Sequence, residues 1–234
     1  MKQKTTPLNT LHNLASSDEY IANEEIGDNH EWSNIETPMH KNAFKLNPKE
    51  KKEKIAGYFT KIMNTLGLDL TDDSLKGTPS RVAKMYVDEI FSGLLPENKP
   101  KIALFENKYS YNEMLVEKNI TLYSNCEHHF VPIIGRAHIG YISSGKVIGL
   151  SKLNRIAQYF AKRPQVQERL TIQIAHELQG ILETEDVAVV ITAEHLCVSS
   201  RGIKDVNSST ISSFFGGKFE SEQKRQEFNN YICL

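Results

Sequence analysis

The sequence lacks a long hydrophobic run. Its longest apolar segment, Val187 to Ala193, is far shorter than the roughly 18 to 20 residues that a membrane-spanning helix needs. The N-terminus is lysine-rich and then polar, without the apolar core that follows the charged start of a secretory signal. We therefore expect no membrane partner and a cytoplasmic location.

The sequence also has few cysteines and a small net charge. The three cysteines, Cys126, Cys197 and Cys233, are too few and odd in number for a disulfide framework. Metal binding or catalysis remain as uses for them, alongside the plain alternative of buried free thiols. The formal net charge is -1, which gives no overall positive field for nucleic acid. Any anion-binding site must therefore be local.

The composition that is present is that of one globular domain. The 234 residues are 39% hydrophobic and 24% charged, which is enough to bury a core and not biased toward disorder. Residues 1–46 are polar and weakly periodic, so we predict a flexible N-terminal extension with, at most, a short helix around 18–26. Residues 47–234 are expected to form the folded domain, beginning with a helical segment at 47–95.

Helix signals are clearest at the start of that domain. Asn47, Pro48 and Glu50 form a capping pattern, and apolar residues then recur at helical spacing as far as Gly67. A second helix is predicted from Thr78 to Gly93. It carries Arg81 and Lys84 one turn apart, a pattern that usually belongs to a solvated face.

Strand patterns follow the helical segment. Short β-branched runs predict strands at 119–123, 136–141 and 146–148, with a hairpin turn at 143–145 between the last two. Two helical patterns come next, at 153–160 and 166–182, and then a buried central strand at 187–193. This order of helices, strands, helices and a strand predicts an α+β fold without internal repeats.

Two short clusters combine cysteine and histidine. In Cys126-Glu127-His128-His129 a thiol and an imidazole are three residues apart, and in His195-Leu196-Cys197 they are two apart and share one side if the strand persists. Each cluster alone is weak, because a single histidine or cysteine is more often part of the core or the surface. Together they provide thiols and imidazoles, which is the ligand chemistry of zinc.

The number of ligands decides between a catalytic and a structural zinc site. If Cys126, His129 and Cys197 bind the ion, the fourth position remains open to water, as in catalytic sites. His128 and His195 then lie beside the metal as acid and base candidates, and two thiolates would weaken the Lewis acidity enough to make such help necessary. If Cys233 is a fourth ligand instead, the site is closed and structural.

Five motifs, in order and spacing, resemble those of the GTP cyclohydrolase type I family. They are Thr78-Pro79-Ser80-Arg81-Val82-Ala83-Lys84-Met85, Cys126-Glu127-His128-His129, Gly149-Leu150-Ser151-Lys152, the run from Arg163 to Leu170, and His195-Leu196-Cys197-Val198 with Arg201-Gly202. The resemblance spans about residues 48 to 228. It implies a tunnelling fold, an antiparallel sheet with helices on one face, whose sheets join between subunits into a β-barrel, commonly in a homodecamer of two pentamers.

The resemblance also implies an activity. It is the hydrolytic opening of the purine ring of GTP to 7,8-dihydroneopterin triphosphate and formate, the first step of folate and related pterin synthesis. One Zn²⁺ per subunit would be held by Cys126, His129 and Cys197, while His128 and His195 would transfer protons. Activated water would attack C8 of guanine, and a second hydrolysis would release formate.

Substrate-binding positions follow from the same resemblance. Glu168 resembles the purine anchor, because a carboxylate can accept from the adjacent N1–H and amino donors of guanine, and the neighbouring Gln167 is assigned to substrate binding with it. Ser151 resembles the residue at the ribose end, although a helix N-cap is its plain alternative. The positions that match triphosphate-binding cations are Arg81, Lys84, Lys152, Arg155 and Arg201. In the family the site lies between subunits, so a monomer should be nearly inactive.

Two other interpretations remain open at this point. One is a metal-independent pterin or deazapurine enzyme of the same fold, such as the nitrile reductases that share the purine-anchoring glutamate; the complete set of Cys126, His129 and Cys197 argues against it. The other is an assembly protein in which zinc only joins the two motifs, which would leave the spare histidines and the five cations unexplained.

Overall fold

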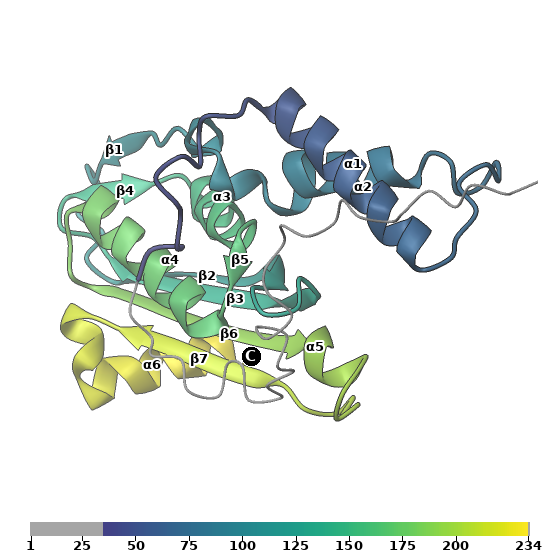
Figure 1. Ribbon diagram of the computed structural model, residues 1–234. Coiled ribbons are helices and arrows are strands. Elements are labelled where there is room, and N and C mark those ends of the chain that lie inside the picture. Colours follow the sequence, from purple (N-terminus) through teal and green to yellow (C-terminus); the bar gives the residue numbers. More distant parts are fainter. Residues whose placement is uncertain (1–34, 234) are drawn as a thin grey trace, which may run out of the picture. The chain divides into compact units, whose positions relative to one another are not determined.

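The computed structural model describes residues 35–233 (Figure 1). The predicted flexible extension at 1–46 lies mainly outside the described residues, and the possible helix at 18–26 lies entirely outside them. Within residues 35–233, no helix combines the length and apolar character needed to cross a membrane.

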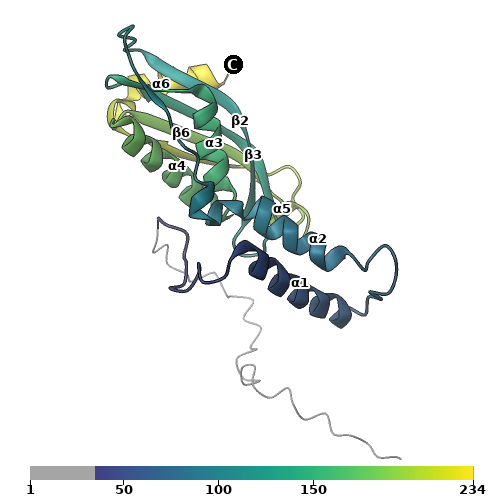
Figure 2. The same cartoon turned by 90° about the horizontal axis from the view of Figure 1, so that it is seen from above.

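The first two helices form where the sequence predicts them. α1 (Pro48–Thr65) begins with a complete capping box, in which the Asn47 side chain accepts from the Glu50 N–H and the Glu50 carboxylate accepts from the Asn47 N–H. α2 (Thr78–Lys84) is shorter than predicted, because the chain continues as a π-helical segment (Met85–Ile90) and a 3₁₀ turn (Ser92–Leu94). α1 and α2 lie side by side in both views of the ribbon (Figures 1 and 2).

A five-stranded sheet forms the centre of the fold, in the order β5-β2-β3-β6-β7. Neighbouring strands are antiparallel except for β5, which is parallel to β2. The strands are β2 (Met114–Cys126), β3 (Pro132–Ile142), β5 (Pro164–Gln165), β6 (Val187–His195) and β7 (Thr210–Phe215). The predicted strands at 119–123, 136–141 and 187–193 are confirmed as parts of longer strands, and 187–193 is central, as expected.

A bulge explains why the first strand looks short in the sequence. The register of β2 against β3 shifts between Glu117 and Ile120, and Asn119 takes a left-handed conformation with φ of 61°. Such a bulge interrupts the alternation of inward and outward side chains. The residues before it therefore do not extend the periodic pattern that identifies residues 119–123.

The predicted hairpin at 143–145 is wrong. A turn does form there, with the Ser143 hydroxyl accepting from the Gly145 N–H and donating to the Lys146 carbonyl. However, β4 (Lys146–Ile148) pairs with β1 (Leu104–Glu106) in a separate two-stranded sheet and not with β3. The turn therefore directs the chain out of the main sheet, a long-range pairing that local turn chemistry does not encode.

Helices cover both faces of the sheet (Figure 1). α3 (Leu150–Ala161) and α4 (Gln167–Leu182) bury their apolar sides against one face. α6 (Glu222–Ile232) covers part of the other face, where Phe228 packs over Gly140 so closely that a Cβ there would lie 2.8 Å from its ring. β6 is consequently apolar at successive residues, since Val189 joins one core and Val190 the other.

The α+β class is confirmed, and the antiparallel sheet with α3 and α4 on one face agrees with the tunnelling fold. The expected arrangement of helices on one face only is incomplete, because α6 also covers part of the other face. The joining of sheets between subunits into a barrel stays a prediction. Two strands offer an edge for it: within residues 35–233, β7 has one strand neighbour, and β2 meets the two-residue β5 only at Asn125 and Cys126.

Candidate active site

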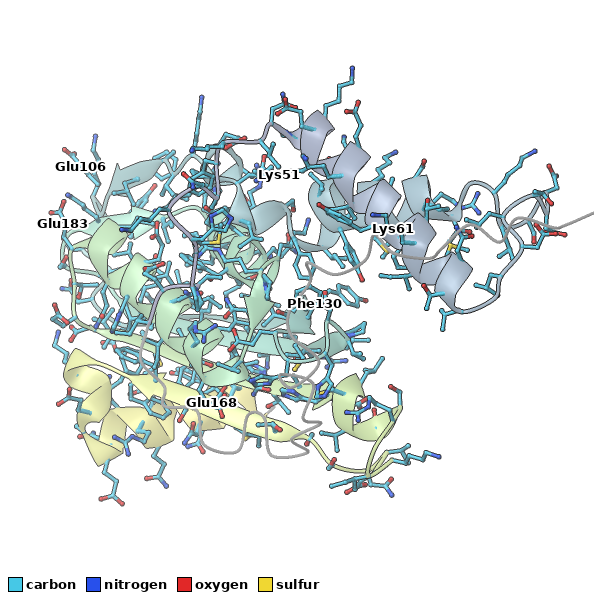
Figure 3. All side chains as sticks on the ribbon, in the orientation of Figure 1. Lys51, Lys61, Glu106, Phe130, Glu168 and Glu183 are labelled. Carbon is cyan, nitrogen blue, oxygen red and sulfur yellow. The ribbon has the colours of Figure 1, made fainter. Side chains whose placement is uncertain are left out.

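The first half of the site is a tight loop between β2 and β3. The Phe130 N–H donates to the Cys126 carbonyl at 2.8 Å, and the Cys126 N–H donates to the Val131 carbonyl at 2.9 Å. Phe130, with φ of 54°, packs its ring 5.0 Å from that of Phe91, centroid to centroid. These contacts fix the loop that carries Cys126 and His129 (Phe130 is labelled in Figure 3).

The second half of the site lies at the end of β6. The strand ends at His195, which is paired with Ile133 of β3, and the chain then forms one helical turn, α5 (Leu196–Ser199). The strand therefore does not persist through Cys197, which was the condition for His195 and Cys197 to share one side of it. The helical turn nevertheless brings Cys197 to the loop after β2.

The three predicted metal ligands come together. One ligand atom each of Cys126, His129 and Cys197 lies within 4.8 Å of the other two. In a tetrahedral site with zinc bonds of about 2.0 to 2.3 Å, ligand atoms lie roughly 3.5 to 3.8 Å apart, so a small inward movement of these side chains lets them share one zinc ion. Cys233 is exposed and, within residues 35–233, does not belong to this group. Three protein ligands are the number that leaves a coordination position for water.

An ion pair joins the metal loop to α4. The guanidinium of Arg169 meets both carboxylate oxygens of Glu127, with Nη2 3.1 Å from Oε1. The two side chains are only 12% and 21% exposed. The Glu127 N–H also donates to the Gln165 carbonyl of β5. The backbone between Cys126 and His128 is thereby held against the segment that enters α4.

A buried hydrogen-bond network surrounds His195. Its Nε2 lies 2.8 Å from Oε1 of Gln167. The two N–H groups of the Gln167 amide face three acceptors at 3.0 to 3.1 Å, which are the carbonyls of Ile191 and Thr210 and the hydroxyl of Ser212. Gln167 is 1% exposed. This catalytic candidate is therefore held by a fully engaged glutamine.

The pKa values of His195 and Cys197 are shifted in opposite directions. Burial lowers the pKa of His195, an effect that the nearby Glu168 carboxylate opposes. Burial, followed by the neighbouring Cys126, raises the pKa of Cys197. A bound cation would act in the opposite direction on the Cys197 thiol, because metal ligation requires a thiolate.

His128 and Glu168 are exposed, as is the neighbouring ligand candidate His129. Nδ1 of His128 lies 3.6 Å from the Cys126 sulfur. Glu168 stands in the first turn of α4 (Figure 3), next to the buried Gln167 but itself exposed. A carboxylate that a ligand can reach, close to His195, fits the predicted purine anchor.

Of the five predicted phosphate-binding cations, Arg201 lies at this cluster. Its Nη1 donates to Nε2 of His129 at 3.0 Å. Lys152 instead donates to the Lys101 carbonyl, and Arg81 donates to the Ser74 carbonyl and the Thr78 hydroxyl. Lys84, on α2, is exposed like Arg81.

The residues of α3 occupy a different place from the thiols. Arg155 lines a cavity of about 400 Å³ together with Asp88 and Lys162. Ser151 is in the first turn of α3, whose N-cap is Gly149, so the N-cap alternative for Ser151 is wrong. The other end of α3 leads to β5 beside Cys126, and at a rise of 1.5 Å per residue the ten steps from Ser151 to Ala161 span roughly 15 Å.

Sequence reasoning missed several supporting residues. Glu127 and Arg169 stand inside recognised motifs but received no role, although opposite charges beside two site residues were a usable signal. The hydroxyls of Thr171 and Ser212, 2.7 Å apart beneath Gln167, had no such signal. They meet only through the packing of α4 on β7.

The fold and the cluster together define a tunnelling-fold domain with a candidate metal centre. Comparison with known proteins then identifies the family. The family described as GTP cyclohydrolase I matches residues 55–233. The GTP cyclohydrolase 1 of Flavobacterium johnsoniae is 64% identical over 211 residues, covering 90% of this chain and 95% of that protein. The enzyme of the same name from Vibrio cholerae is 57% identical over 195 residues, covering 83% and 89%. The chain belongs to the GTP cyclohydrolase I family.

Proposed function

We propose that this chain opens the purine ring of GTP at the Cys126, His129 and Cys197 centre, in a site that a second copy completes. The reaction is that of the family: GTP and water give 7,8-dihydroneopterin triphosphate and formate, the first step of pterin and folate biosynthesis. The observation that carries the proposal is the convergence of the three ligand atoms within 4.8 Å, beside two histidines and an exposed glutamate.

Zinc suits the donor set, because two thiols and one imidazole form a soft site with an open position. When bound, the ion supplies a Lewis acid and a water whose pKa is lowered to about 7. Cys126 and Cys197 neutralise much of its charge, so the proton transfers depend on the nearby imidazoles of His128 and His195.

The roles of the chain's own groups follow from their positions. The Glu168 carboxylate accepts from the N1–H and amino group of guanine and so orients C8 toward the centre. Water adds to C8, the imidazole ring opens to a formamide, and a second hydrolysis releases formate. His128 and His195 hold and return the protons that these steps move. Rearrangement of the ribose and ring closure then give the pterin.

The triphosphate requires several cations, and the chain carries them in two places. Arg201 lies beside His129. The remaining candidates are Arg81, Lys84, Lys152 and Arg155, with Ser151 at the ribose end. Ser151 is roughly 15 Å of helix away from the β5 end of α3. Completion of the site by groups from another copy accounts for this separation.

Open strand edges support such an assembly. Unpaired strand edges are templates for pairing with another chain, and the outer edges of β2 and β7 could join copies into a closed ring. A homodecamer of two pentamers in the cytoplasm, with one zinc per subunit, is the form that we propose.

The decisive experiment uses purified protein of known metal content with GTP. Absorbance in the dihydropterin band and formate release are followed together, with His128→Ser as the inactive control. Both signals should disappear on chelation and return with added Zn²⁺. Bound zinc with no formate from the unmodified protein would contradict the proposed activity and favour a structural zinc site.

A further inference from the structure

Gln167 and Glu168 are adjacent in sequence but differ in solvent exposure. Glu168 is exposed at the start of α4, whereas Gln167 is 1% exposed. Every polar atom of the Gln167 side chain already has a partner in the chain. A side chain in this state has no group to offer a purine unless it first breaks buried hydrogen bonds, which is costly.

The orientation of the Gln167 amide is fixed by chemistry. Its nitrogen lies 3.0 Å from the carbonyl oxygens of Ile191 and Thr210, and carbonyls only accept hydrogen bonds. A flipped amide would direct its oxygen at both of them. Oε1 must therefore face His195, and the Nε2 of His195 must donate to it.

This contact also decides which ring nitrogen can face substrate. A neutral imidazole has one N–H and one lone pair. Since the N–H stands on Nε2, the lone pair is on Nδ1. Gln167 therefore both orients the ring of His195 and selects the tautomer in which Nδ1 is the proton acceptor.

The support of the amide extends to two hydroxyls. The Ser212 hydroxyl accepts from the Gln167 nitrogen at 3.1 Å and lies 2.7 Å from that of Thr171, which in turn donates to the Gln167 carbonyl. Thr171 is 1% and Ser212 is 9% exposed. Hydrogen bonds with residues of α4 and β7 thus fix the position of the Gln167 side chain.

We propose that Gln167 is a positioning residue for His195 and not a contact to the purine, so that Glu168 alone anchors the base from this turn of α4. This inference rests on the proposed function, because it assigns His195 a part in proton transfer. It makes a distinct kinetic claim: loss of Gln167 acts on kcat, whereas loss of a purine contact acts on KM.

The test compares Gln167→Met with Gln173→Met in the zinc-loaded enzyme. Gln173 is a matched control because it lies on the same helix, is 3% exposed and has its own hydrogen bonds, to the Gln165 side chain and the Ile35 carbonyl. We expect Gln167→Met to lower kcat by roughly 10²-fold, the scale of one acid–base group, with KM for GTP nearly unchanged. Gln173→Met should retain kcat. A raised KM with normal kcat in Gln167→Met would overturn the inference.

A double-mutant cycle provides a second measurement. If Gln167 acts only through His195, Gln167→Met should cost nothing further in a His195→Ala background. Losses that multiply would overturn the inference. Ser212→Ala serves if Gln167→Met folds poorly, since it loosens the amide without approaching substrate; it should lower kcat by a few fold, and an unchanged kcat would count against the proposal. An unmodified enzyme that releases no formate would instead contradict the proposed function.

Discussion

Two regions of this molecule carry polar residues with predicted roles, and they are built differently. The metal-loop region, made of residues 126–129, 167–169 and 195–197, is held by a buried network, an ion pair and a tight turn. The α2–α3 cation region, made of Arg81, Lys84, Lys152 and Arg155, consists of long side chains on helix surfaces. Three of these four cations are exposed, and the fourth, Lys152, is half-buried.

The difference follows from what each part of the reaction requires. Proton transfer and metal ligation require side chains that are placed to a fraction of an ångström. The residues that perform them therefore need neighbours that hold each side chain in one conformation. A triphosphate is a flexible, multiply charged group, for which cations on long stems are sufficient. In the proposed assembly, one chain supplies the whole metal-loop region of a site and a neighbouring copy supplies the cation region.

The largest expected effect is on kcat and follows from a change in the metal-loop region, whereas a change in the cation region should act mainly on KM. Cys126→Ser removes one of the three proposed metal ligands, so we expect zinc to be lost and kcat to fall by at least about 10³-fold, because metal-activated water and the associated acid–base steps fail together. Lys152→Gln should mainly raise KM for GTP. Metal analysis and steady-state formate release measure both.

Cys233→Ser is the matched control for the metal site. Cys233 is exposed and, among the described residues, not part of the converging trio, so zinc content and kcat should match the unmodified enzyme. Release of zinc by this variant would instead favour a closed, structural site and would remove the contrast between the two regions.

Mixing inactive variants tests whether the two regions act across copies. Cys126→Ser retains the α2–α3 cation region, and Lys152→Glu retains the metal-loop region. If each site takes one region from each of two neighbouring copies, co-expression at equal levels should restore up to about a quarter of the sites, since both halves are intact in that fraction. Tandem purification on two tags isolates the mixed oligomers for a formate assay.

The mixing experiment would give no recovery of activity if each site were built from a single chain. If both regions serve one site within a single chain, the mixed oligomers stay as inactive as the separate variants. Singly tagged oligomers of each variant, assayed at the same GTP concentration, give the background against which recovery is measured.

Sequence patterns predicted the parts of the site that depend on residue type. Cys126, His129 and Cys197 were identifiable because thiols and imidazoles are rare and chemically specific. The patterns also gave the bounds of α1 and α4 closely, since capping and periodicity are local. The helical turn at Leu196–Ser199 was not predicted, because a four-residue turn has too little periodicity to detect.

Other features depend on contacts that no local pattern records. The pairing of β4 with β1 joins segments some forty residues apart. The role of Gln167 depends on three acceptors, one supplied by β6 and two by β7. A motif can indicate that Gln167 belongs to the site, but its burial and the direction of its amide come only from the packed structure.

The smallest predicted effect concerns the ion pair that fixes the metal loop. Arg169→Gln leaves the Glu127 carboxylate largely buried without its cation, so we expect about 2 to 3 kcal/mol of lost stability, somewhat less than for a fully buried pair. For a chain of this size that corresponds to a fall in melting temperature of about 5 °C or more at fixed protein concentration. Lys76→Gln is the control, because its pair with Asp73 is 63% and 93% exposed and should contribute under about 0.5 kcal/mol. Zinc affinity should fall in Arg169→Gln alone, since only that pair restrains the loop between Cys126 and His129. Equal melting shifts in the two variants would mean that the metal-loop region is no more firmly held than the exposed surface.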